Sequence, residues 1–123
     1  MSRSILLVED DESIRKPLAL FLAQEGYSVI TAGNGNDALD WLHKNSPPAL
    51  ILLDLMMPVM NGAEFLSRRR RDPMLCTVPV VVLTAWQHRW QDVADVQGIL
   101  PKPIDTAKLL AVTARYCERS VTA

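Results

Sequence analysis

The amino-acid sequence predicts an α/β fold in which helices cover both faces of a five-stranded parallel sheet. Short apolar segments alternate with segments of helical periodicity along the whole chain, and neither a repeat nor an internal linker interrupts them. Such alternation favours right-handed βαβ units and therefore a parallel sheet. The chain has 123 residues, the size of one ordinary domain, so we expect residues 1–123 to form a single domain.

Five short apolar segments are predicted to be the strands. Most are unbroken apolar runs, which are typical of parallel strands buried on both faces. The fourth segment is the richest in β-branched residues, and the fifth is very short. The predicted strands are residues 4–8, 27–32, 49–53, 78–83 and 99–100.

The segments between and after the strands are predicted to be helices. Apolar residues recur at helical spacing in the first, which Gly26 ends, and Pro17 should bend this helix or mark a late start. Asn36 or Asp37 can cap the second helix, and Asp105 can cap the last. The other two predicted helices are one that ends near residues 72–73 and a weakly patterned one over residues 86–96.

Five strands alternating with five helices at this length favour the doubly wound, flavodoxin-like strand order. Ligands of such sheets bind beyond the carboxyl ends of the strands, so the residues there are the candidates for chemistry. They are Glu9, Asp10, Asp11 and Glu12 after the first strand, Asp54 after the third, Thr84 after the fourth and Lys102 after the fifth.

The acids among these residues predict a metal site. Carboxylates that lie close together repel one another, and a hard divalent cation such as Mg²⁺ relieves that repulsion. Lys102 adds a fixed positive charge, and Thr84 adds a hydroxyl that can donate to an anion. A metal ion, an ammonium and a hydroxyl around one carboxylate form a pocket for a phosphoryl group, with Asp54 as the nucleophile.

Four motifs stand in order at the predicted strand ends. They are Leu-Leu-Val-Glu-Asp-Asp-Glu at 6–12, Leu-Asp-Leu-Met-Met-Pro at 53–58 with Asn-Gly at 61–62, Leu-Thr-Ala at 83–85 and Pro-Lys-Pro at 101–103. Together they resemble the response-regulator receiver domains of two-component signalling, the CheY-like family, over essentially the whole chain. The resemblance implies a receiver that a histidine kinase or His-phosphotransfer protein phosphorylates, so that the surface seen by a downstream protein changes.

The resemblance also implies how the metal would be held. Asp54 resembles the phosphoacceptor, which also contacts the metal ion. Asp10 resembles the carboxylate that binds Mg²⁺ directly, and Glu9 one that acts mostly through water. The backbone carbonyl of Met56 would complete the protein's share of the metal shell.

Thr84 and Lys102 resemble the two residues that hold the phosphoryl group in the family. Each would contact one phosphoryl oxygen, and the Lys102–Pro103 peptide bond is expected to be cis. A receiver of this kind catalyses only its own phosphorylation and dephosphorylation, so we do not expect an enzyme that turns over a separate substrate.

Three features depart from the family pattern. Ile99 stands three positions before Lys102, where relatives have an aromatic residue, so it cannot act as the same rotamer switch. The stretch from Thr84 to Lys102 is about one helical turn shorter than usual, so the family's usual dimer is not carried over. Met56 and Trp86 flank the expected path of an attacking water, and we therefore expect slow autodephosphorylation.

Other functions fit the sequence less well. An aspartate-dependent phosphatase would have a second aspartate two residues after the nucleophile, where this chain has Met56. A flavin-binding electron carrier needs a phosphate-binding loop where residues 9–12 are acidic. A degenerate receiver that only binds proteins is opposed by the complete set of acids, threonine and lysine. Three settings stay open: a stand-alone regulator, the receiver of a larger regulator, and a fragment of a hybrid kinase.

Composition and charge exclude several other classes. The net charge of -1 gives no overall field that would attract nucleic acid or an anionic membrane. No segment resembles a membrane span or a signal peptide, so we expect a cytoplasmic protein with Cys76 and Cys117 as reduced thiols. The arginines at 68–71 are expected to solvate a helix end rather than bind nucleic acid, and His43 and His88 show no partner. The oligomeric state stays open.

Overall fold

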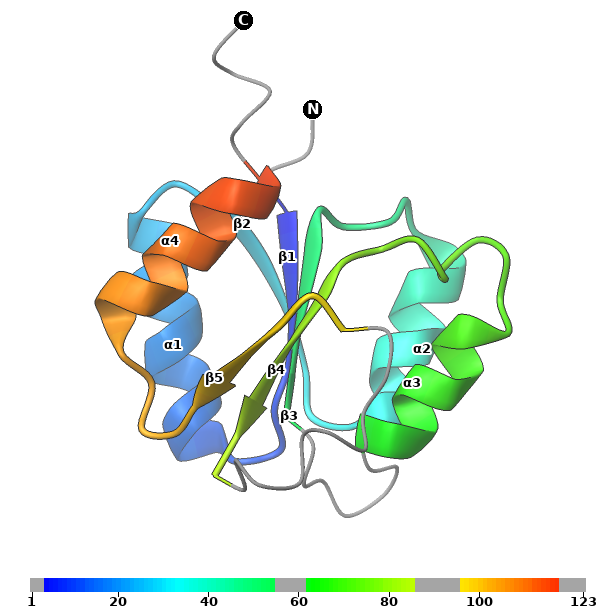
Figure 1. The fold of residues 1–123 in the computed structure, drawn as a ribbon, viewed down its shortest axis with the longest axis horizontal. Coiled ribbons are helices and arrows are strands. Elements are labelled where there is room, and N and C mark those ends of the chain that lie inside the picture. The colour runs from blue at the N-terminus through cyan, green and yellow to red at the C-terminus, as the bar shows by residue number, and fades with distance from the viewer. Residues whose placement is uncertain (1–3, 55–61, 86–95, 118–123) are drawn as a thin grey trace, which may run out of the picture.

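The computed structural model describes residues 4–54, 62–85 and 96–117 of the chain. Within these ranges five strands form one parallel sheet in the order β2-β1-β3-β4-β5, as Figure 1 shows. The predicted fold class is confirmed. The strands are β1 (Ser4–Val8), β2 (Ser28–Ala32), β3 (Leu50–Asp54), β4 (Val80–Thr84) and β5 (Gly98–Pro101).

Helices cover both faces of this sheet. Two of them, α1 and α4, pack on one face, and the other two, α2 and α3, pack side by side on the opposite face (Figure 1). The helix expected over residues 86–96 falls almost wholly outside the described residues. The described helices are α1 (Glu12–Gln24), α2 (Gly35–Lys44), α3 (Gly62–Arg70) and α4 (Thr106–Cys117).

Alternate residues of the strands build two separate cores. On β1, Ile5 and Leu7 face α1 and α4, whereas Leu6 and Val8 face α2 and α3. Every residue of β3 and β4 is buried. Successive side chains of a strand point to opposite faces, so covering both faces requires apolar residues at every position. This explains the unbroken apolar runs from which the strands were predicted.

The first helix, α1, begins at Glu12, well before Pro17. The carboxylate of Asp11 accepts a hydrogen bond from the backbone N–H of Ser13 at 2.9 Å, which caps α1 at Glu12. Pro17 therefore lies inside the helix, so of the two alternatives predicted for it, a bend or a late start, the late start is wrong. After α1 the chain turns at Gly26, whose φ of 97° favours glycine because a side chain there is strained.

The second helix is capped by a different residue from the two predicted. Oδ1 of Asn34 accepts a hydrogen bond from the backbone N–H of Asp37 at 2.8 Å, and α2 begins at the next residue, Gly35. Asn34 has the extended dihedral angles that a cap requires, whereas Asn36 and Asp37 are already helical. The predicted cap of the last helix is confirmed, because Oδ1 of Asp105 lies 2.9 Å from the backbone nitrogen of Ala107.

One member of the arginine run is buried. Arg69 is 2% exposed, and its Nε and Nη2 atoms donate to the carbonyl oxygen of Val78 at 3.1 and 2.6 Å. The expectation that the whole run solvates the helix end is wrong for this position. Residue 69 follows the buried Phe65 and Leu66 at helical spacing, so its side chain leaves α3 on the covered face.

His43, for which no partner was expected, lies beside an acidic residue. Its Nε2 atom lies 3.1 Å from Oδ2 of Asp72, because α2 packs beside α3 and the turn that follows α3. His88 lies outside the described residues. Cys76 is exposed, Cys117 is buried, and neither forms a disulfide in this structure.

Within the described ranges, no helix has the length and apolar character that crossing a lipid bilayer would require.

Candidate functional site

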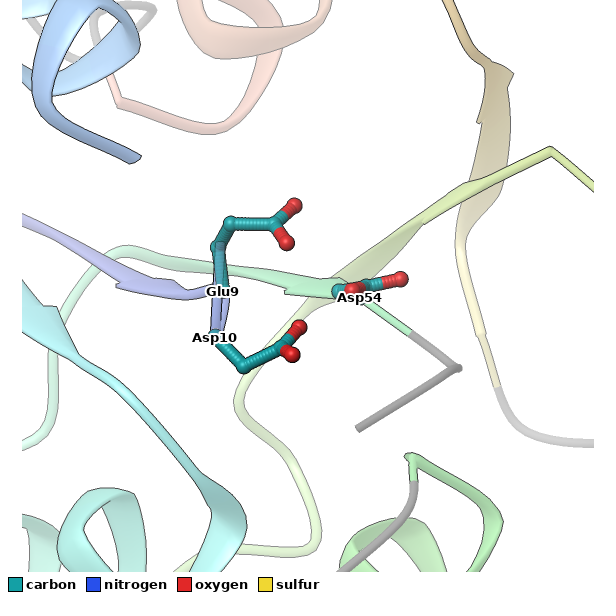
Figure 2. Close-up of side chains that lie close together, drawn as sticks. All are labelled: Glu9, Asp10 and Asp54. Carbon is teal, nitrogen blue, oxygen red and sulfur yellow. The ribbon is translucent and has the colours of Figure 1, made fainter. Parts of the chain in front are cut away.

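Three carboxylates gather where β1 and β3 end. Glu9 and Asp10 directly follow β1, and Asp54 is the last residue of β3 (Figure 2). One oxygen atom from each of the three carboxylates lies within 4.8 Å of the others. Glu9 and Asp54 are buried, whereas Asp10 is exposed. Three hard oxygen donors at this spacing fit a divalent cation such as Mg²⁺, with the exposed acid on the solvent side.

Lys102, which follows the edge strand β5, places a positive charge beside these acids. Its Nζ atom lies 3.0 Å from Oε1 of Glu9 and 3.5 Å from Oδ1 of Asp54. Burial alone lowers the pKa of Lys102, but the hydrogen bond to Glu9 and the charges of Asp54 and Glu9 outweigh it, so the pKa lies above its ordinary value. The side chain is therefore an ammonium at neutral pH.

The strand register brings the remaining predicted residues to the same edge. Asp54 is paired with Leu83 between β3 and β4, and Thr84 is paired with Pro101 between β4 and β5. The backbone nitrogen of Lys102 also donates to the carbonyl oxygen of Thr84 at 2.9 Å. Thr84 is fully buried, and the peptide bond after Lys102 is cis, as the resemblance implied.

A cavity of about 240 Å³ opens between these groups. It is lined by Glu9, Asp10, Asp11, Ile14, Asp54, Ala85 and Lys102. A larger cavity of about 680 Å³ lies between α2 and α3, around Leu39 and His43. We place the functional site at the smaller cavity, because of these two cavities it is the one where described carboxylates and an ammonium converge on a buried acid.

The four consecutive acids after β1 have different partners. Asp11 caps α1, and the hydrogen bonds from the side chain and the backbone of Ser13 lower the pKa of its carboxyl group. Glu12 forms an ion pair with Lys16 one turn along α1. Glu9 and Asp10, the two acids that were predicted to serve the metal, are the ones that face Asp54.

One residue near the site, Arg15, was not singled out from the sequence. Its Nη1 atom lies 2.8 Å from the carbonyl oxygen of Glu9 and 3.4 Å from that of Asp10. The sequence indicates Arg15 only through its position on the helix. A side chain in the first turn of a helix leans back toward the preceding loop, and here that loop holds the candidate metal ligands. Met56 and Trp86, two other residues named from the sequence, lie outside the described residues.

The chain is similar to known proteins along most of its length. The family model described as response regulator receiver domain matches residues 5–114. The transcriptional regulatory protein CpxR homolog of Haemophilus influenzae is 38% identical over 125 residues, which cover 96% of this chain and 52% of that protein. An uncharacterized 14.6 kDa protein of Leptolyngbya boryana is 34% identical over 117 residues, which cover 92% of this chain and 88% of that one.

The structural comparison gives the same relationship. The chemotaxis response regulator CheY4 of Vibrio cholerae matches with a TM-score of 0.83 and 30% sequence identity, over 94% of this chain and 99% of that one. The chain spans about half the length of the longer curated relatives that it matches.

Proposed function

The chain belongs to the family of response regulator receiver domains, and on that premise we propose that Asp54 accepts a phosphoryl group in a Mg²⁺-dependent reaction. One observation carries the proposal: the ammonium of Lys102 and the carboxylates of Glu9 and Asp10 converge on Asp54 at the carboxyl edge of the sheet. The donor would be a histidine kinase or a His-phosphotransfer protein, in the cytoplasm.

The transfer itself requires little more than alignment and charge neutralisation. An oxygen of the Asp54 carboxylate attacks phosphorus, the bond from phosphorus to the donor atom breaks, and the leaving group keeps the electron pair. Lys102 supplies a permanent positive charge 3.5 Å from Oδ1 of Asp54, where negative charge collects on the phosphoryl oxygens. The hydroxyl of Thr84, at the neighbouring strand end, would donate to one of them.

Glu9, Asp10 and Asp54 are the described residues that would hold the metal, together with the backbone carbonyl of Met56. Bound Mg²⁺ would neutralise the carboxylates and the incoming phosphoryl oxygens. Glu9 is already hydrogen-bonded to Lys102, which supports a role for Glu9 through water rather than direct ligation. Asp10 is exposed, so its carboxylate is accessible to the ion and would bind it directly.

The outcome of the reaction would be a switch rather than turnover. An acyl phosphate on Asp54 adds negative charge at the sheet edge, and the protein surface near Thr84 and Lys102 would change with it. Slow loss of the phosphoryl group remains a prediction, based on Met56 and Trp86. A receiver that signals by protein binding alone is the competing function.

Intact-mass measurement with acetyl phosphate and Mg²⁺ tests the proposal. The wild-type protein should gain one phosphoryl group that hydroxylamine removes, and Asp54→Asn should gain none. Asp40→Asn, which removes an exposed acid from α2, is the matched control and should behave as the wild type. A gain that persists in Asp54→Asn would place the acceptor elsewhere. No gain in a wild-type protein that binds Mg²⁺ would favour signalling by binding alone.

A further inference from the structure

The guanidinium of Arg15 is bonded to the loop that carries the metal-site acids. Arg15 lies in the first turn of α1, and its backbone N–H donates to the carbonyl oxygen of Asp11 at 2.8 Å. Its Nη1 atom reaches back to the carbonyl oxygens of Glu9 at 2.8 Å and Asp10 at 3.4 Å. A single side chain therefore contacts two successive peptide groups of the loop.

The surroundings keep this side chain in place. Arg15 is half-buried, and a Cβ atom added to Gly33 would lie only 3.4 Å from its Nη1 atom. The guanidinium is thus covered by the loop that follows β2. The last residue of β2 also holds Glu9, because the backbone N–H of Glu9 donates to the carbonyl oxygen of Ala32 at 3.0 Å. Both peptide groups of Glu9 are hydrogen-bonded.

We propose that Arg15 is a positioning residue for the metal site. By holding the carbonyl oxygens of Glu9 and Asp10, it fixes the directions in which their carboxylates leave the loop, and so preorganises them for Mg²⁺. The inference rests on the proposed function of this site, since it concerns the same carboxylates. Partners outside the ligand set that orient the ligands typically change metal affinity by about 10- to 100-fold.

A change in Mg²⁺ affinity on replacing Arg15 could also come from the loss of its positive charge, but that loss would change the affinity in the opposite direction. A positive charge near three carboxylates opposes the binding of a cation, so its removal should strengthen Mg²⁺ binding. Loss of positioning should weaken Mg²⁺ binding, because the ion must then order the loop itself. The direction of the change therefore separates the two explanations.

Isothermal titration with MgCl₂ alone measures this direction. Arg15→Gln should raise the dissociation constant for Mg²⁺ by about tenfold or more. Lys16→Gln removes an exposed positive charge at the next position of α1 and should leave the constant unchanged or lower it slightly. Arg15→Lys keeps the charge but replaces the planar, rigid guanidinium with a more flexible ammonium, so it should give an intermediate value. Equal or tighter binding by both Arg15 variants would overturn the proposal.

Amide hydrogen exchange without metal gives a second readout. The N–H groups of Glu9 and Asp11 donate to the carbonyl oxygen of Ala32 and to Oε2 of Glu9, at 3.0 and 3.3 Å. Both should exchange faster in Arg15→Gln than in Lys16→Gln, while urea midpoints show that each variant folds. A wild-type protein that binds no Mg²⁺ would overturn the proposed function. In that case the exchange rates alone decide whether Arg15 holds the loop, and unchanged rates would refute it.

Discussion

Nζ of Lys102 lies 3.0 Å from Oε1 of Glu9, a residue 93 positions earlier in the chain. Glu9 follows β1 near the middle of the sheet, and Lys102 follows β5 at its edge, so only the completed sheet brings them together. A buried carboxylate is costly without a partner, and this contact supplies one. The ammonium that satisfies Glu9 is the same one that lies beside Asp54. Folding therefore assembles the charge that phosphoryl transfer would use.

Replacement of Lys102 by methionine should destabilise the protein. The substitution keeps most of the side-chain volume but leaves the buried carboxylates of Glu9 and Asp54 without their cation. We expect the free energy of unfolding to fall by about 2–4 kcal/mol in urea titrations at pH 7 without Mg²⁺. Lys108→Met, at an exposed position of α4, should change it by less than about 0.5 kcal/mol. Equal effects of the two substitutions would contradict this prediction.

The contribution of Lys102 should also depend on pH. Its pKa in the folded protein is raised above the ordinary value of 10.5, so the folded state holds the proton more tightly than the unfolded chain. The stabilisation is complete below the unfolded pKa and is lost as the pH rises through the higher folded pKa. The difference in unfolding free energy between wild type and Lys102→Met should be constant near neutrality and shrink above about pH 10.5. A difference that grows at alkaline pH would have the wrong sign.

Two neighbouring asparagines should respond in opposite directions to alanine substitution. Asn34→Ala removes the side chain that accepts from the N–H of Asp37, and should lower the free energy of unfolding by about 1 kcal/mol. Asn36→Ala replaces an exposed residue inside α2 with a better helix former, and should raise it by a few tenths of a kcal/mol, about the difference in helix propensity. Thermal and urea denaturation of both variants measure these changes. If Asn36→Ala lowered the free energy of unfolding more than Asn34→Ala does, Asn36 would be the cap of α2, as the sequence predicted.

The buried arginine of α3 should matter far more than its exposed neighbour. Arg69→Met keeps an apolar stem of similar length but removes both donors to the carbonyl oxygen of Val78. We expect a loss of about 1–3 kcal/mol in the free energy of unfolding, because a buried acceptor is left with fewer donors. Arg70→Met should stay within about 0.5 kcal/mol of wild type. Similar losses at the two positions would argue against this account of residue 69.

The sheet was predictable because its strands are buried on both faces. The requirement for an apolar residue at every position produced runs such as residues 49–53 and 78–83, which differ from β3 and β4 by only one or two residues at their ends. The rule that ligands bind at carboxyl strand ends then placed Asp54 and Lys102 together before any distance was known.

The remaining details depend on backbone angles and on distances across the sheet. Asn34, Asn36 and Asp37 all have side chains that can cap a helix, and only the extended backbone of Asn34 selects it. The contact of Lys102 with Glu9 depends on the register of every strand between them. The burial of Arg69 was not predicted because the residue belongs to a run of four arginines. Its spacing from Phe65 does, however, place it on the covered face of α3.

The alternation that builds two cores also limits how the chain can change length. Removal of one residue from β3 would exchange the side chains that face α1 with those that face α3, and would turn Asp54 away from Lys102. Fold and site would be lost in one step. Residues 45–47 are exposed and precede the amino end of β3, at the edge farthest from the carboxylates. Variation in length should therefore accumulate there, and a library of insertions would survive at that edge while the strands stay fixed in length.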